Sequence, residues 1–396
     1  MCTAAIAQDA AGCDQQRYRT YITDNVSVTA DILYGAGNLF PTEVPVDLYF
    51  DVYEPFDDTV EERPVVVVAF GGSFIDGTRQ DMDFVCRDLA QRGYVAVSID
   101  YRLYDGPLFP LPTATTMRNV VIRAVSDMKG AIRYLRQDAD QSNTYGIDPS
   151  RIYVGGISAG SILASHVAML DDTDDLPDEL RGIIDSNGGL EGNSNDITGY
   201  GTEVSGLINY SGGLNDASWI DADDPVFFSV HDENDGVVPY AGGFATVFGF
   251  PIIYMEGSAL LKEVADSVGV YNELITFENS VAHVGFLLNE QSTLNVFNST
   301  AAFLHAEVCP AIVSSTGELT STEISVYPNP ATGLVNITLS EDEHLTRVEL
   351  SNTTGLTYEL PYQGNTVDIA ALPSGLYTLT AYTTAGGAAT TKLVVH

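Results

Sequence analysis

The chain has 396 residues, of which 45% are hydrophobic, a composition that supports a full core and argues against bulk disorder. Its 17 Lys and Arg residues are outnumbered by 54 Asp and Glu residues, which gives a formal net charge of −37. This charge argues against nucleic acid or anionic membrane as a partner, because both would be repelled. No run of about 18 apolar residues occurs, so we expect no membrane span.

The N-terminus resembles the end of a signal peptide. Residues 4–9 read Ala-Ala-Ile-Ala-Gln-Asp, which places a small-x-small cleavage pattern near Ala7. We interpret residues 1–8 as a signal-peptide remnant, so that Cys2 would be absent from the mature protein. One disulfide is then expected among Cys13, Cys86 and Cys309, and the sequence does not choose the pair.

Strand and helix patterns alternate through residues 9–310, which we interpret as one catalytic domain. Repeated βαβ units of this kind predict a mostly parallel central sheet with helices on both faces. Strands are expected at Val46–Tyr53, Pro64–Phe70, Tyr94–Asp100, Arg151–Val154, Val204–Tyr210, Val226–Val230 and Leu274–Phe277, and helices at Asp81–Arg92, Arg118–Gln137, Ser161–Leu170 and Leu294–Val308.

The segment Asp171–Thr202 breaks this pattern, because it is rich in Gly, Asn and Asp. It follows a helix and could cap a pocket, or it could be an ordinary surface excursion. Its acidic cluster, Asp171–Asp175, could hold Ca²⁺, but no ligand loop of defined spacing is visible and a solvated surface is the better interpretation.

The most informative stretch is Gly156-Ile157-Ser158-Ala159-Gly160, a G-x-S-x-G pentapeptide between a predicted strand and a predicted helix. Strand, tight turn, Ser and helix form the arrangement that exposes a nucleophilic hydroxyl. The turn strains the Ser backbone, so glycines are needed where a Cβ would clash. The sequence predicts Ser158 as a nucleophile.

A serine nucleophile needs a base, and we assign this role to His283 among six histidines. His283 lies in a loop after a predicted strand, where the base belongs when the chain order is Ser, acid, His. The other five have less suitable contexts: a chain terminus, the C-terminal module, two helices and a strand end beside the expected acid. These are His396, His344, His166, His305 and His231.

The acid that orients the base should follow the strand Val226–Val230, where three candidates compete. We favour Asp235, because a turn and an apolar-Pro stretch hold it. Asp232 at the strand end and Glu233 remain the alternatives. The oxyanion needs backbone N–H donors, and we expect these from Ala159 after the nucleophile and from Gly72 and Ser73 after the strand Pro64–Phe70.

With these residues in place, residues 14–309 resemble the α/β-hydrolase superfamily, and within it bacterial carboxylesterases with an H-G-G-type oxyanion loop and a G-x-S-A-G elbow. The resemblance implies the α/β-hydrolase fold. Phe70 stands where such enzymes usually have His, which puts a loop-anchoring hydrogen bond in doubt. Four aromatic residues could line the pocket, although core packing is the default for each: Phe70, Phe74, Trp219 and Tyr240.

Composition changes after Cys309, and residues 311–322 are predicted to form a Ser/Thr-rich linker. Residues 323–396 show short alternating strands, which predicts a small all-β sandwich module. Its Val326–Gly333 start, Leu372–Tyr377 segment and Thr391–Val395 end resemble the sorting domain of the type IX secretion system. That resemblance implies export across the outer membrane of a Gram-negative bacterium, with the secretion machinery as a partner. A carbohydrate-binding or adhesive sandwich is the alternative.

Together these features predict a secreted serine carboxylic-ester hydrolase that forms an acyl-enzyme and needs no metal or organic cofactor. The expected substrates are polysaccharide-linked acyl, aromatic (including feruloyl) or polyester-type esters. A secreted serine peptidase of the same fold is the alternative, although such enzymes usually carry a propeller or a large lid. A non-enzymatic adhesion protein is less consistent with a complete set of Ser, His and Asp.

Overall fold

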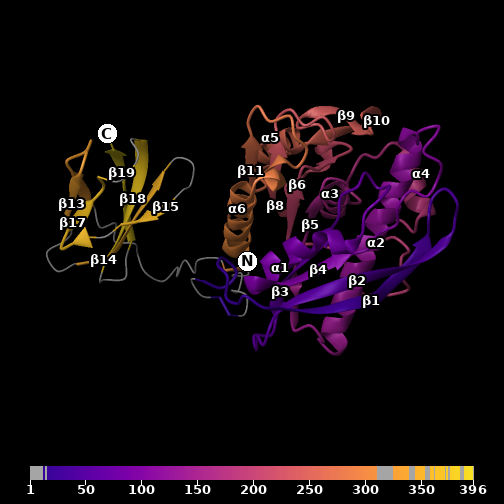
Figure 1. Cartoon of the computed structure of the whole chain (residues 1–396), viewed down its shortest axis with the longest axis horizontal. Helices are drawn as coiled ribbons and strands as arrows, with labels where there is room; N and C mark the ends of the chain where they lie inside the picture. The colour runs from indigo at the N-terminus through magenta and orange to yellow at the C-terminus, as the bar shows by residue number, and fades with distance from the viewer. Residues whose placement is uncertain are drawn as a thin grey trace, which may run out of the picture. The chain divides into compact units, whose positions relative to one another are not determined.

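A computed structural model describes residues 12–13, 16–309, 324–338, 344–352, 357–360, 362–370, 372, 375–383 and 388–395. The predicted signal remnant at 1–8 and linker at 311–322 lie outside these residues. The chain divides into two compact units, residues 1–311 and 312–396 (Figure 1). Among the described residues, no helix combines the length and apolarity needed to cross a membrane.

The first unit is built on an eight-stranded sheet in the order β1-β2-β4-β3-β5-β6-β8-β11. Strand β2 runs antiparallel to both β1 and β4, and every later neighbour pair is parallel. The sheet therefore confirms the expected mostly parallel α/β architecture. Its strands are β1 (Val26–Asn38), β2 (Pro45–Pro55), β3 (Arg63–Ala69), β4 (Val95–Ile99), β5 (Ile147–Ile157), β6 (Gly206–Tyr210), β8 (Val226–Asp232) and β11 (Asn272–Phe277).

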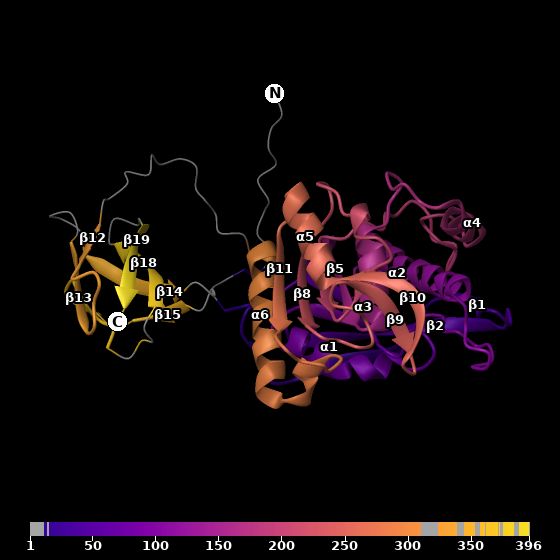
Figure 2. The ribbon, with the colours of Figure 1, turned by 90° about the horizontal axis from the view of Figure 1, so that it is seen from above.

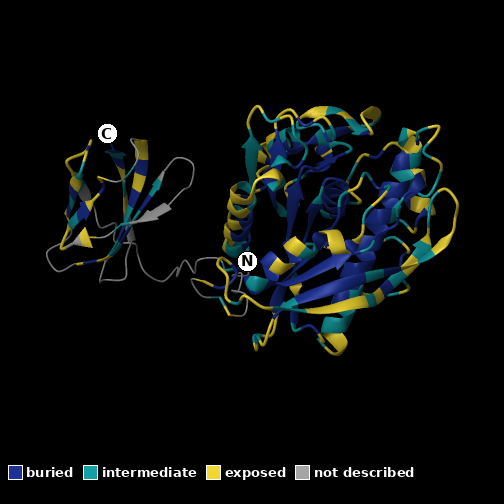
Figure 3. Ribbon diagram, viewed as in Figure 1, coloured by how far each residue is buried: buried dark blue, intermediate teal, exposed yellow. Residues whose placement is uncertain are grey.

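Strands β3, β4 and β6 are buried over their whole length (Figure 3), as the unbroken apolar sequence of β3 predicts for that strand. Val65–Val68 of β3 are at most 1% exposed, and the residues of β4 and β6 are also buried. Burial on both faces requires helices on both sides of the sheet. Those helices are α1 (Asp83–Gln91), α2 (Ala114–Gln141), α3 (Ala159–Met169), α5 (Ser258–Val268) and α6 (Glu290–Val308), while α4 (Asp178–Ser186) packs on α2.

The helices fall into two groups, which the strand order explains. From β3 the chain passes through α1 to β4, which lies on the β2 side of β3. From β4 it passes through α2 to β5, which lies on the other side of β3, so the two connections run in opposite directions along the sheet. Because crossovers between parallel strands are right-handed, α1 and α2 must cover opposite faces. Helix α6 joins α1 through stacked Phe84 and Phe297 rings 6.0 Å apart, whereas α3 packs beside α2 (Figure 2).

Several elements were not expected from the sequence. These are β1, α4 and α5, the short strand β7 (Gly213–Leu214), a hairpin of β9 (Gly242–Val247) and β10 (Phe250–Gly257), and the single turns η1 (Arg79–Met82), η2 (Ala217–Trp219) and η3 (Gly285–Leu288). Strand β1 has a mostly exposed surface and bulges, so it lacks the apolar alternation that identifies a strand. The hairpin forms a separate three-stranded sheet with β7.

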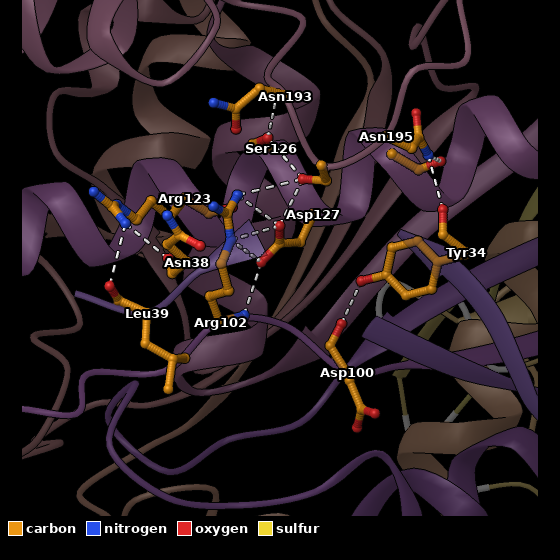
Figure 4. Close-up of polar contacts among 12 residues, drawn as sticks. Tyr34, Asn38, Leu39, Asp100, Arg102, Arg123, Ser126, Asp127, Asn193 and Asn195 are labelled. Carbon is orange, nitrogen blue, oxygen red and sulfur yellow. Dashed lines mark hydrogen bonds and ion pairs between the residues drawn. The ribbon is translucent and has the colours of Figure 1, made fainter. Parts of the chain in front are cut away.

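The segment after α3 is fastened to the body of the unit by a buried polar network (Figure 4). Ser194 donates to Asp127 of α2 at 2.6 Å, and the same carboxylate receives the Arg102 guanidinium. Arg102 and Asp127 are 4% and 0% exposed, so neither charge could be buried without the other. Asn195 reaches the carbonyl oxygens of Tyr34 and Gly130. These bonds fix the irregular chain that follows α4.

One disulfide joins Cys13 to Cys309, 296 residues apart, and resolves the pairing that the sequence left open. It links the start of the described chain to the residue after α6. Cys86, on buried α1, remains a thiol. Burial raises its pKa well above the ordinary value, which makes it unreactive.

The second unit contains two four-stranded antiparallel sheets, in the orders β12-β13-β17-β16 and β15-β14-β18-β19. Alternate residues such as Val335, Ile337, Val348 and Leu350 are buried in a core of its own. The strands are β12 (Ser325–Tyr327), β13 (Leu334–Thr338), β14 (Leu345–Asn352), β15 (Thr357–Glu359), β16 (Tyr362–Gln363), β17 (Thr366–Asp368), β18 (Gly375–Thr383) and β19 (Ala388–Val395).

Candidate active site

Ser158 occupies the strained turn that the pentapeptide predicts. It lies between β5 and α3 with φ 55° and ψ −117°, a conformation that a non-glycine residue rarely adopts. The turn packs against the end of β3: a Cβ on Gly160 would lie 2.0 Å from the carbonyl oxygen of Ala69, and a Cβ on Gly156 2.4 Å from Gly160. Both glycines are therefore required for the turn to approach β3.

The structure brings Ser158, His283 and Asp235 into one hydrogen-bonded chain. The Nε2 atom of His283 lies 2.7 Å from the Ser158 Oγ, and its Nδ1 atom lies 2.6 Å from Asp235 Oδ2. The three residues come from the β5–α3 turn, the loop after β11 and the turn after β8. Because parallel strands end at the same edge of a sheet, residues 125 positions apart meet there.

Asp235 is one of two buried acids at the end of β8, and it is the one that contacts His283. Its side chain is 0% exposed and also accepts the backbone N–H groups of Val237 and Val238. Burial alone would raise its pKa, but hydrogen bonds from His231, His283 and Val237 outweigh burial and lower the pKa to about 2. The carboxylate is therefore ionised at any pH at which the protein would work.

The two alternative acids hold the loop that carries His283. Asp232 accepts the N–H of Gly285 at 2.6 Å, and Glu233 accepts the N–H of Asn279 at 2.6 Å. Asp232 therefore binds the loop after His283, and Glu233 binds it before His283. Neither carboxylate has a hydrogen bond to His283 in the described part of the chain.

Two of the other histidines are buried near the site without bonding to Ser158. His231 is 0% exposed and binds the Ser258 hydroxyl and the Val238 carbonyl, with Nε2 3.5 Å from Asp235. It therefore approaches the same Asp235 oxygen, Oδ2, that His283 contacts. His166 lies on α3, with Nδ1 2.8 Å from the Ile162 carbonyl oxygen.

Two of the three expected oxyanion residues, Ser73 and Ala159, line the cleft with Ser158, and Gly72 lies in the loop between β3 and Ser73. A Cβ on Gly71 would lie 3.3 Å from that of Ser158, so the loop after β3 contacts the nucleophile turn directly. Gly72 has φ +123°, and a Cβ there would meet the Asp76 carbonyl oxygen at 1.9 Å, so only glycine fits. Ser73 and Ala159 both line the cleft beside Ser158.

Phe70, the residue that replaces the usual His, is anchored in another way. Its ring stacks on Tyr101 at 4.3 Å, and the Tyr101 hydroxyl donates 2.8 Å to the Phe70 carbonyl oxygen. The ring also lies so close to Gly77 that a Cβ there would be 2.4 Å away. A loop-anchoring hydrogen bond is therefore present, supplied by a tyrosine from the adjacent strand end.

An apolar cleft of about 720 Å³, including space open to solvent, extends from Ser158. Of the four aromatic residues considered from the sequence, Phe74 lines it, whereas Phe70, Trp219 and Tyr240 do not. Most of its wall comes from α2, α3 and the unforeseen β9–β10 hairpin: Met117, Val121, Ile122, Ile162, Ala245, Val247, Ile252, Ile253 and Met255. Leu180 of α4 also lines it, so the irregular segment after α3 does contribute to the pocket.

The acidic cluster forms loop caps. The carboxylate of Asp174 accepts the backbone N–H of Asp171, and that of Asp224 accepts the N–H of Asp221. Within the described residues, no three His, Cys, Asp or Glu side chains gather as a metal site would require.

Two family models match the chain. Residues 50–212 match BD-FAE, an α/β-hydrolase esterase domain, and residues 325–396 match the Secretion system C-terminal sorting domain. These matches confirm the expected pairing of an esterase-type α/β-hydrolase domain with a sorting domain. The second match indicates export by type IX secretion to the cell surface or outside the cell.

Curated relatives match a short part of the chain. Esterase LipI of Mycobacterium tuberculosis is 34% identical over 108 residues, or 27% of this chain and 29% of that protein. The probable isoprenylcysteine alpha-carbonyl methylesterase ICME of Oryza sativa subsp. japonica is 34% identical over 115 residues, or 29% of this chain and 24% of that protein. Lipase 2 of a Moraxella species is 36% identical over 99 residues, or 25% of this chain and 19% of that protein. The chain thus spans about a quarter of their lengths.

Solved structures support the fold over a longer range. Esterase 2 of Thermogutta terrifontis, phosphoramylated by tabun, has a TM-score of 0.52 at 22% identity and covers 72% of this chain and 97% of its own. The same esterase phosphorylated by paraoxon gives a TM-score of 0.52 at 22% identity and covers 72% and 96%. The first unit therefore has the α/β-hydrolase fold.

Proposed function

We propose that this chain, which pairs an α/β-hydrolase domain with a secretion sorting domain, is a secreted serine carboxylic-ester hydrolase. The observation that carries the proposal is the continuous set of hydrogen bonds from Asp235 through His283 to Ser158, at the edge of an apolar cleft. That arrangement activates a hydroxyl, and the esterase-type family match supplies the reaction class.

In this mechanism the Ser158 Oγ attacks the ester carbonyl carbon while His283 Nε2 accepts its proton. Asp235, ionised and buried, keeps the Nδ1 proton of His283 directed away from Ser158 and stabilises the imidazolium. The oxyanion receives N–H donors from Ala159, Gly72 and Ser73. His283 then returns the proton to the leaving alkoxide. Water, deprotonated by His283, attacks the acyl-enzyme and releases the acid.

The substrates we propose are esters on polymers outside the cell: acyl groups on polysaccharide, aromatic acyl groups or polyester-type esters. Export makes such polymers accessible, and the apolar walls of the cleft suit the acyl group. The net charge of −37 disfavours strongly anionic polymers. Neutral carriers are therefore expected.

The test compares the purified full chain with Ser158→Ala on short p-nitrophenyl esters, with peptide anilides as a second substrate class. We expect ester hydrolysis and labelling by a fluorophosphonate probe, with kcat falling about 10⁴-fold or more in Ser158→Ala. Ser165→Ala is the matched control, because that hydroxyl lies on α3, which begins just after Ser158, and among the described residues it donates to the Ser161 carbonyl. Peptidase activity without esterase activity would overturn the proposal.

A further inference from the structure

His166 is placed in the substrate cleft but has no part in the mechanism above. It lies two helical turns beyond Ser158 on α3, and Ala159, Ile162 and His166 all line the cleft. Residues at this spacing share one face of a helix. The cleft therefore extends along α3 from the nucleophile to His166.

The tautomer of His166 follows from the hydrogen bond that its ring makes to the helix backbone. Its Nδ1 lies 2.8 Å from the Ile162 carbonyl oxygen, and a carbonyl can only accept, so Nδ1 carries the proton. Burial lowers the pKa of His166 to about 4, against the opposing effect of that bond, so the ring is neutral near pH 7. Its Nε2 is then an acceptor.

The ring of His166 is held in place by its neighbours. Its Nε2 acceptor, however, has no hydrogen-bond partner among the residues that the structure describes. His166 is 4% exposed, and the edge-on ring of Trp219 lies 5.7 Å from it. Nε2 is not one of the fully enclosed side-chain atoms that lack a partner, so it keeps accessible surface on the cleft that His166 lines, where an entering group supplies the donor.

The cleft walls include the polar side chains of Asn215 and Thr246, but no described residue donates a hydrogen bond to His166 Nε2. Around α3 they are formed by aliphatic side chains including Met117, Val121 and Leu180. The guanidinium of Arg118, which also lines the cleft, is paired with Glu179 at 3.0 Å. A ligand that fills the cleft must therefore be apolar for most of its length and must carry its donor at the His166 end.

We propose that His166 is a specificity-determining residue, whose Nε2 accepts a hydrogen bond from a hydroxyl group at the far end of the substrate's acyl chain. This inference rests on the proposed function, because it places the ester carbonyl at Ser158. Eight residues of helix separate the two positions, a rise of about 12 Å. Since helical side chains lean toward the N-terminus, the ring comes nearer to Ser158, and an acyl chain of roughly six to ten atoms spans the distance.

The experiment compares pairs of p-nitrophenyl esters whose acyl chains have equal length and end in either a hydroxyl or a methyl group. The measured quantity is the ratio of kcat/KM values within each pair, because this ratio cancels differences in folded fraction between preparations. For the wild type we expect a ratio about 5- to 10-fold in favour of the hydroxyl at one chain length, the effect of one buried hydrogen bond.

His166→Phe keeps an aromatic ring beside Trp219 but lacks the acceptor, so the ratio should invert in favour of the methyl group. His166→Gln retains an acceptor and should keep part of the preference. His305→Phe, on α6 and outside the cleft lining, is the matched control and should show the wild-type ratio. If His166→Phe fails to fold, the wild-type and His166→Gln ratios still decide the question.

A wild-type ratio near one at every length would mean that bound water satisfies Nε2, and it would overturn the inference. So would an unchanged ratio in His166→Phe. Both results differ from failure of the proposed function. In that case the wild type would not hydrolyse even the acetate ester. The acetyl group is too short to reach His166, so its hydrolysis tests the proposed function alone.

Discussion

The hydroxyl of Tyr101 donates a 2.8 Å hydrogen bond to the carbonyl oxygen of Phe70, and the two rings stack at 4.3 Å. Phe70 is the last residue before the Gly71-Gly72-Ser73 loop, and Tyr101 comes just after the adjacent strand β4. The bond therefore fixes the position from which the oxyanion loop leaves the sheet.

Tyr101→Phe should lower kcat for a short p-nitrophenyl ester by about 5- to 10-fold and leave KM nearly unchanged. The reason is that one hydrogen bond of about 1 kcal/mol no longer holds the loop in the geometry that stabilises the oxyanion. Tyr34→Phe is the matched control, because the Tyr34 hydroxyl also donates to a carbonyl, that of Asp100 (Figure 4). Equal kinetic losses in both variants would show that the effect is only one of stability.

Asp235→Asn should reduce kcat by about 10⁴-fold, because the amide would favour the wrong tautomer of His283. Glu233→Gln retains an acceptor for Asn279 and should change kcat little. These two variants distinguish Asp235 from Glu233, two of the acids that the sequence left as candidates for orienting His283. A large loss in Glu233→Gln with a small one in Asp235→Asn would contradict the assignment.

Asp235 should also contribute to acid stability. Its pKa of about 2 in the folded protein is below the ordinary 3.8, so the stabilisation is present above pH 4 and is lost as the pH falls through about 2. The difference corresponds to about 2 kcal/mol of unfolding free energy. Chemical denaturation at several acid pH values should show a shallower loss in Asp235→Asn than in the wild type.

Asp224 should have the opposite pH dependence. Burial raises its pKa to about 7 against the hydrogen bond from Asp221, with further raising by Asp221 and Asp171. A raised pKa stabilises the fold fully below pH 4, and this contribution is lost as the pH rises through about 7. Asp224→Asn, which keeps the acceptor for Asp221, should therefore stabilise the protein by about 1 kcal/mol near pH 8. Equal unfolding free energies of variant and wild type at that pH would contradict this.

Removal of the Cys13–Cys309 disulfide should destabilise the first unit by about 2–5 kcal/mol, because the bond closes a loop of almost the whole unit. The double variant Cys13→Ser with Cys309→Ser should unfold at a lower temperature than the wild type. Reducing agent should lower the unfolding temperature of the wild type to a similar extent and leave that of the double variant unchanged. An effect of reductant on the double variant would point to another bond.

The regular part of the fold could be predicted because buried positions carry apolar residues at the spacing of a strand or a helix. The apolar run of β3 and the amphipathic α1 are recognisable for this reason. Strand β1 and the β9–β10 hairpin were missed, because exposed positions and glycines weaken their alternation. Part of the cleft wall was missed with them, since that hairpin contributes Ala245, Val247 and Ile253 to it.

The sequence by itself determined the strained turn at Ser158 and the choice of a small set of partners for it. Gly156 and Gly160 leave the backbone few alternatives, and chain order restricts the base and the acid. Only the tertiary structure decided which acid faces His283, which cysteine pairs with Cys13 and what anchors Phe70. These depend on distances between residues far apart in the chain, and such distances exist only once the strands have assembled into the sheet.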